Sequence, residues 1–169
     1  MVLTTEELLS GLHHETHILV HLASKADPSM HDYRPTPSQR SMLELLQYLA
    51  IMGPTQIELI RNDGFNRAAL GIAWTAAEQR AKAMTFDEAV ETIRVMPDEY
   101  RRLLSDWTDD FLRTEIDMFG NRFSRGKMLT MLVYNAHAAY RTQLFCYLKS
   151  CGRHELGTMN LWAGQDAPK

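Results

Sequence analysis

Apolar residues recur every three or four positions along most of the 169-residue chain, which is the spacing of helices that bury one face. The first such stripe consists of Leu8, Leu12, Thr16, Leu19 and Ala23. Thr4 and Glu7 form a capping-box pattern at its start, which predicts a helix from there to about Lys25. Because no sustained alternation of period two occurs, we predict an all-α protein.

A loop rich in proline follows, and Ser41 with Glu44 forms a second capping box at the start of the next helix. We expect the dipeptide Gly53-Pro54 to kink or break that helix. A turn is predicted at Asn62-Asp63-Gly64, and a short helical piece at residues 75–84.

A third main helix is expected from Thr85 to about Asp106, with a kink or restart at Pro97. A fourth is expected from the capping residue Ser124 to Gly152, whose lack of a side chain suits the left-handed end of a helix. The core face predicted for the fourth helix consists of Leu129, Leu132, Ala136, Tyr140, Gln143 and Tyr147.

These elements predict one domain over residues 1–169, an antiparallel four-helix bundle with short extra helices and the possibility of long crossovers. The last residues show no periodicity, and we expect Leu161 and Trp162 to pack this C-terminal tail onto the bundle. The apolar segments Ile57–Ile60 and Phe111–Phe119 are suited to an interface, and together with the frequent dimerisation implied by the family resemblance given below they lead us to expect a homodimer.

The net charge of −3 and the scattered basic residues argue against a nucleic-acid partner. No apolar run approaches the roughly 20 residues that span a bilayer, and residues 1–17 lack the basic segment of a signal peptide. Cys146 and Cys151 diverge on a helix, so no disulfide is expected between them. We therefore expect a soluble cytoplasmic protein with no membrane contact.

Four histidines crowd the first helix: His13, His14, His17 and His21. Their phase places them opposite the apolar stripe, which favours a solvated face over a metal site. His137 lies within the most apolar helix, where a hydrogen-bonded core residue is the favoured interpretation. Arg141 and Gln143 lie near it, and a polar pocket inside the bundle would also explain these groups.

The segments YRPTPSQRSMLELLQYLA, FGNRFSRGKMLTMLVYNAHAAYRTQLFCYLKSCG and NLWAG together resemble the DinB/YfiT-like superfamily. In that family a proline-rich loop precedes the second helix, and a motif of the form H-x-x-x-H-R-G-Q marks the fourth. Arg141 and Gln143 match the end of that motif. The resemblance implies a DinB-like four-helix bundle and a divalent metal, zinc or nickel, held by three histidines.

Carried over by position, those three ligands fall near Gln47 and on Ala136 and Tyr140, none of which is histidine. We therefore expect the usual metal site to be missing. In its place we predict a pocket for a small molecule or partner, formed by Gln47, His137, Tyr140, Arg141, Gln143 and Tyr33.

Two finer expectations depend on this resemblance. The hydroxyl of Tyr140 is expected to pair with Gln47 as the polar tie between the second and fourth helices. The alternative function is a metal-dependent thiol transferase or isomerase of the DinB/YfiT type, whose ion would be held by a non-standard histidine set such as His137 with His17 or His21.

Overall fold

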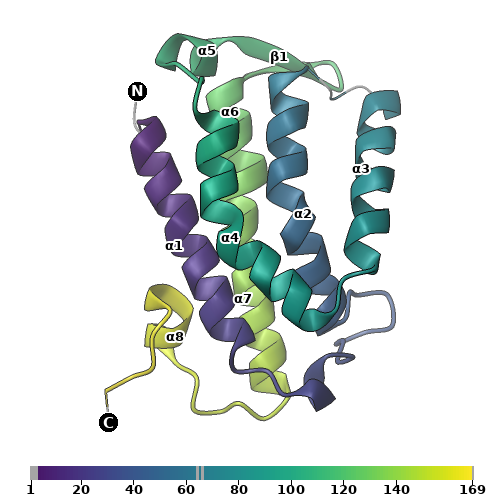
Figure 1. The fold of residues 1–169 in the computed structure, drawn as a ribbon, viewed down its shortest axis with the longest axis vertical. Coiled ribbons are helices and arrows are strands. Elements are labelled where there is room, and N and C mark those ends of the chain that lie inside the picture. The colour runs from purple at the N-terminus through teal and green to yellow at the C-terminus, as the bar shows by residue number, and fades with distance from the viewer. Residues whose placement is uncertain (1–3, 64, 66, 169) are drawn as a thin grey trace.

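The computed structural model describes residues 4–63, 65 and 67–168, so Gly64 of the expected turn and the first three residues lie outside the described part. Within those residues, four long helical segments form the bundle (Figure 1), and the protein is all-α as predicted. They are α1 (Thr5–Ala23), α2 (Met42–Arg61), α4 (Phe86–Leu104) and a final helix made of α6 (Arg125–Leu129), η2 (Thr130–Tyr134) and α7 (Asn135–Ser150).

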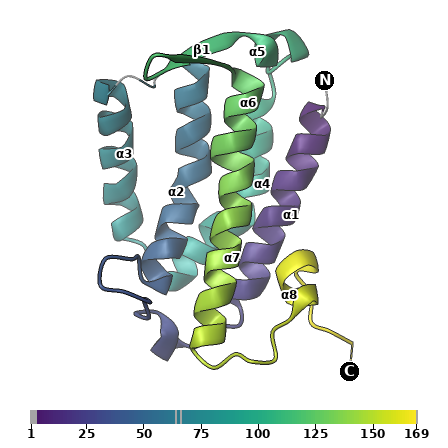
Figure 2. The ribbon, with the colours of Figure 1, turned by 180° about the vertical axis from the view of Figure 1, so that it is seen from behind.

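Each long helix contacts two others, because α1 packs against α4 and α7, and α2 packs against the same pair. Figures 1 and 2 show that α1 and α7 run in one direction while α2 and α4 run in the other. The expected antiparallel arrangement is therefore wrong for the pairs α2–α4 and α1–α7. The parallel pair α2–α4 requires a long crossover, and α3 (Arg67–Lys82) provides it.

The helix starts follow the capping signals in the sequence. Thr4 with Glu7 and Ser41 with Glu44 each form the complete capping box, in which side chain and backbone exchange hydrogen bonds. A third box begins α4 in the same way. By contrast, the proline residues do not break the helices, since α2 and α4 are each continuous through Pro54 and Pro97.

A hairpin that the periodicity did not predict connects α4 to the last helix. After the short helix α5 (Asp109–Arg113), strand β1 (Glu115–Met118) pairs antiparallel with β2 (Asn121–Ser124). Phe119 and Gly120 form its two-residue turn with φ values of 52° and 86°. The strands are too short to show an alternating pattern, and the turn has phenylalanine where hairpin turns favour asparagine or aspartate.

The π-helical segment η2 changes which face of the last helix enters the core. A π turn contains one extra residue, so every later side chain is rotated relative to a regular α-helix. From η2 onward, the buried residues of the last helix are Val133, His137, Arg141, Leu144, Tyr147 and Leu148. Leu132, Ala136, Tyr140 and Gln143, which were expected on the core face, are half-buried instead.

The centre of the bundle contains a hydrogen-bonded pair. Tyr100 and His137 are both fully buried, and the Tyr100 hydroxyl lies 3.0 Å from Nε2 of His137. Nδ1 of His137 lies 2.9 Å from the Val133 carbonyl oxygen. Since a carbonyl only accepts, Nδ1 carries the proton and Nε2 accepts from the tyrosine. The favoured interpretation of His137 as a hydrogen-bonded core residue is therefore confirmed.

The C-terminal segment packs against α1 mainly through polar contacts. Helix α8 (Thr158–Ala163) places the buried Asn160 amide 3.1 Å from Nε2 of His21, and Lys25 pairs with Asp166 at 2.7 Å. Packing of the tail is confirmed. The Trp162 side chain is 59% exposed and lies on the surface of the bundle, with the Arg141 guanidinium 4.7 Å from its ring centre.

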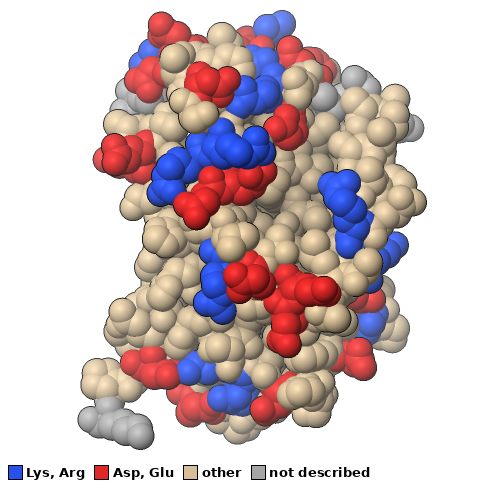
Figure 3. All heavy atoms as spheres, in the orientation of Figure 1, with Lys and Arg blue, Asp and Glu red and all other residues tan. Residues whose placement is uncertain are grey.

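The outer surface is charged and mixed in sign. Three i,i+3 ion pairs lie along α4, and Figure 3 shows basic and acidic groups side by side on that face.

The segment Ile57–Ile60 does not offer the dimer surface expected of it. Its apolar side chains Ile57, Leu59 and Ile60 are buried in the core. None of the described helices combines the length and apolar character that a membrane span requires.

Two glycine-to-alanine substitutions test the packing around Tyr100. A Cβ on Gly53 would lie 1.8 Å from the Tyr100 hydroxyl, whereas a Cβ on Gly71, within α3, would meet nothing within 4 Å. We expect Gly53→Ala to lower the free energy of unfolding by about 1–3 kcal/mol or more. Gly71→Ala should raise it by up to about 1 kcal/mol through helix propensity. Urea denaturation measures both, and equal effects would contradict the packing described.

Candidate functional site

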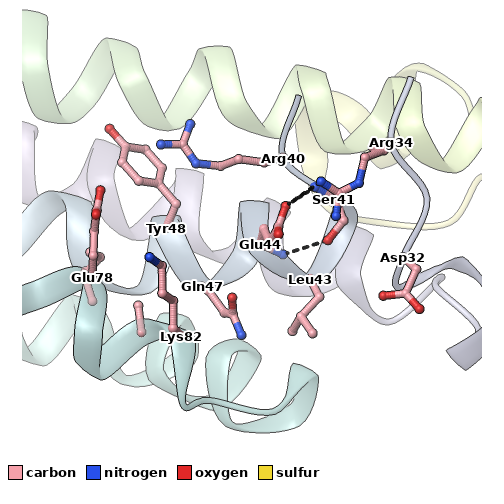
Figure 4. Close-up of a pocket in the computed structure, with 12 residues that line it drawn as sticks. Asp32, Arg34, Arg40, Ser41, Leu43, Glu44, Gln47, Tyr48, Glu78 and Lys82 are labelled. Carbon is pink, nitrogen blue, oxygen red and sulfur yellow. Dashed lines mark hydrogen bonds and ion pairs between the residues drawn. The ribbon is translucent and has the colours of Figure 1, made fainter. Parts of the chain in front are cut away.

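A cavity that Gln47 lines lies between α2, α3 and the loop before α2, and we call it the α2–α3 cleft (Figure 4). Its volume is about 530 Å³, within the range of small-molecule sites. The cleft is lined by Asp32, Arg34, Arg40, Ser41, Leu43, Glu44, Gln47, Tyr48, Ile51, Glu78, Ala81 and Lys82.

Backbone hydrogen bonds fix the loop that forms one end of the cleft. The amide of Met42 donates to the Tyr33 carbonyl oxygen at 3.0 Å, and that of Leu43 donates to the His31 carbonyl oxygen at 2.9 Å. The Tyr147 hydroxyl, from α7, donates to the Arg40 carbonyl oxygen at 3.0 Å. The loop is therefore held on α2 and α7, which positions the side chains it presents to the cleft.

Gln47 is a buried polar side chain that faces the cleft, with 7% of its surface exposed. Its Nε2 donates to the Met84 carbonyl oxygen at 2.8 Å, at the connection between α3 and α4. The Met84 carbonyl oxygen can only accept, so the nitrogen of the Gln47 amide faces it. The oxygen of the same amide then points away from Met84, toward the side of the cleft where Tyr48 and Arg40 lie in Figure 4. Among the described residues, this oxygen has no hydrogen-bond partner.

Tyr48 forms the aromatic wall of the cleft. The Arg40 guanidinium lies 4.0 Å from the centre of its ring, and Trp74 of α3 stacks on the ring at 5.6 Å. Tyr140 contacts the same ring edge-on at 5.2 Å. Burial, followed by the neighbouring Tyr140, raises the pKa of Tyr48, so its hydroxyl stays protonated at neutral pH.

The charges in the cleft are only partly compensated within it. Arg34 pairs with Glu44 at 3.3 Å, and Glu44 also accepts from the backbone of Ser41. That hydrogen bond is the main reason that the pKa of Glu44 is lowered. The other charged side chains are Arg40, Lys82, Glu78 and Asp32, and none of them forms an ion pair with any residue that the structure describes.

The structure does not bring the six expected pocket residues together. Gln47 lines the cleft, and Tyr140 lies next to it, with its ring against that of the lining residue Tyr48. Tyr33 and Gln143 instead contact Tyr147, the first by its ring at 5.6 Å and the second by a hydrogen bond to the hydroxyl. The expected pairing of Tyr140 with Gln47 is wrong, because Gln47 donates to Met84 and the Tyr140 hydroxyl meets that of Tyr48.

Arg141 lies on a different side of the last helix, facing α1. Its Nε forms a buried ion pair with Glu15 at 2.8 Å, and its guanidinium also lies 4.7 Å from the ring centre of Trp162. Burial raises the pKa of Glu15, and the charge of Arg141 opposes that shift. This residue therefore joins α1, α7 and α8, and does not line the cleft.

The residues at the positions of the family's metal ligands do not fit an ion. The Gln47 amide nitrogen donates a hydrogen bond to the Met84 carbonyl oxygen, and the Tyr140 hydroxyl contacts that of Tyr48. The side chain of Ala136 has no atom that could bind a metal. The described residues contain no group of three or more His, Cys, Asp or Glu placed to hold a metal.

The alternative histidine set is not assembled either. Both ring nitrogens of His137 are engaged inside the core, as described above. His21 meets Asn160, and His17 lies against the backbone at Gly164, so both face the C-terminal segment. His13 and His14 are exposed, as the helical phase predicted.

Sequence reasoning missed most of the charged groups in the cleft. Arg40 and Asp32 lie in a loop, while Glu78 and Lys82 lie on α3. Only the fold places these segments beside α2. The i,i+4 spacing of Glu78 and Lys82 was a signal that both lie on one face of a helix.

Comparisons with known proteins support the fold. Neither the models of known families nor the curated proteins give a match to this sequence. The structure is similar to the crystal structure of a DinB-like protein, YjoA, from Bacillus subtilis, with a TM-score of 0.67 and 18% sequence identity. The similarity covers 89% of this chain and 95% of that one. The fold is therefore DinB-like, as the sequence resemblance implied.

The buried state of His137 predicts a dependence of stability on pH. Burial lowers the pKa of His137 from 6.5 to about 4, so between these values the unfolded chain binds a proton that the folded protein does not. The contribution to stability is therefore complete above pH 6.5 and is lost as the pH falls toward 4. We expect His137 to account for a loss of roughly 3 kcal/mol over that interval.

The measurement is urea denaturation from neutral pH to pH 4, compared between the wild type and His137→Leu. The variant should be less stable at neutral pH, because Tyr100 loses its acceptor, but its stability should fall less on acidification. His154→Gln removes an exposed histidine and serves as the control. Parallel curves for the wild type and His137→Leu would contradict this assignment.

Proposed function

We propose that this protein binds a small molecule with an anionic group, such as a carboxylate, in the α2–α3 cleft. The observation that carries the proposal is the amide of Gln47, which is almost fully buried and anchored by Met84. Its oxygen faces a cavity of about 530 Å³ without a partner among the described residues. Solvent reaches this oxygen, so an N–H group of a ligand would exchange its own hydrogen bond and that of the oxygen with water for one inside the cleft.

The anionic group is assigned from Arg40 and Lys82. Arg40 is stacked on Tyr48, which restricts its side chain before any ligand arrives. A guanidinium held in this way loses less entropy when it binds a carboxylate. Lys82 provides a second cation from α3, and neither is neutralised by an ion pair within the described residues.

Binding, without a chemical step, is the function that these groups support. The hydroxyl of Tyr48 has a raised pKa and acts as a hydrogen-bond donor, which is unsuited to accepting a proton near neutral pH. The transferase alternative needs a metal, and the residues at the expected ligand positions do not fit one.

Calorimetric titration with N-acetyl-alanyl-alanine tests the proposal, because this probe has one carboxylate and amide N–H groups. We expect the wild type to bind it, and Gln47→Met to weaken the binding by about tenfold, which corresponds to one net hydrogen bond. Lys82→Gln should weaken it by about threefold to tenfold.

Arg80→Gln is the matched control, because it removes a cation from the same helix outside the cleft. Its affinity for the probe should equal that of the wild type. Thermal unfolding of each variant establishes that it is folded. Absence of binding by the folded wild type at millimolar probe, or equal losses in Lys82→Gln and Arg80→Gln, would overturn the proposal.

A further inference from the structure

The charges of the α2–α3 cleft are separated along its length. Arg34 and Glu44 neutralise each other through their ion pair, which leaves four charged side chains to determine the field inside the cleft. In Figure 4, Arg40, Lys82 and Glu78 gather around Tyr48 at one end, and Asp32 lies at the other end, beyond Leu43. Two cations face one carboxylate at the Tyr48 end, and a single carboxylate remains at the loop end.

Between these ends the cleft offers an acceptor and an apolar surface. The oxygen of Gln47 is the acceptor described above, and Leu43 is the apolar side chain on the way to Asp32. A ligand that extends along the cleft therefore meets net positive charge, then a hydrogen-bond acceptor, then negative charge.

We infer that the ligand is a small zwitterion of the amino-acid or dipeptide class, an inference that rests on the proposed function. Its carboxylate lies between Arg40 and Lys82, an N–H group donates to the oxygen of Gln47, and its ammonium group faces Asp32. The cleft's volume of about 530 Å³ accommodates a molecule of this size.

The same charges disfavour the other common classes of small anion. A phosphate ester or nucleotide carries two or more negative charges, and Glu78 beside the cations would repel the additional charge. At the loop end, Asp32 would repel any second anionic group. A monocarboxylate without a positive group leaves Asp32 without a partner, so it forms fewer favourable contacts than a zwitterion.

Three probes with the same backbone separate these possibilities. Alanyl-alanine is the zwitterion, N-acetyl-alanyl-alanine has only the negative charge, and alanyl-alanine amide has only the positive charge. Calorimetric titration of the full chain at neutral pH and low salt gives the three affinities. We expect alanyl-alanine to bind about threefold to tenfold more tightly than either of the other two.

Two substitutions assign the contacts. Asp32→Asn should remove the preference for alanyl-alanine over the acetylated probe, and leave the affinity for the acetylated probe undiminished. Lys82→Gln should reduce the preference for alanyl-alanine over the amide. Asp27→Asn is the matched control for Asp32→Asn, because it removes an exposed carboxylate from the same loop region outside the cleft.

The outcomes distinguish the two proposals. If the acetylated probe binds as tightly as alanyl-alanine and its binding requires Gln47, the zwitterion inference is overturned and the proposed function stands. If Asp32→Asn and Asp27→Asn have the same effect on the preference, the contact with Asp32 is overturned. If none of the three probes binds the folded wild type, both proposals fail.

Discussion

The hydrogen bond between Tyr100 and His137 constrains three helices at once. It ties α4 to α7 at the centre of the bundle, and the tyrosine hydroxyl lies so close to α2 that a side chain at Gly53 is excluded. Both residues are removed from water, so each needs the other as a partner. The extra residue of the π-helical segment η2 rotates the last helix so that His137 points inward.

The same rotation determines what the rest of the last helix does. Arg141 is turned toward α1, where it pairs with Glu15, and Tyr140 is turned toward Tyr48 at the edge of the α2–α3 cleft. A buried ion pair contributes little net stability but is costly to break, so it favours one arrangement of α1, α7 and α8 over others. The polar residues that suggested one pocket in the sequence therefore belong to separate contacts.

Local signals predicted most of the helices, because capping boxes and apolar stripes act within a few residues. The rotation at η2 was not predictable in this way, since Thr130–Tyr134 has no proline or glycine to mark a change of period. A shift of the buried face by one residue was enough to make the prediction that Ala136 and Tyr140 lie in the core wrong. The cleft was missed for another reason: Arg40 and Lys82 are far apart in the sequence, and only the crossover through α3 brings them to the same cavity.

The attachment of α3 differs from that of the other helices, and this affects the cleft. Leu70, Ala73 and Trp74 of α3 pack against the edge of the main core, and Ala77 and Ala81 form a second, small apolar cluster with Ile51. Among the described residues of α3 only Ala77 and Ala81 are buried, whereas α2 and α4 bury leucine, isoleucine and methionine side chains, so we expect α3 to open locally at a lower free-energy cost than those helices. Because Lys82 and Glu78 lie on α3, a ligand that contacts both walls favours the closed arrangement and stabilises α3 by mass action. Weak packing of this helix thus makes the cleft accessible without disturbing the core that positions Gln47.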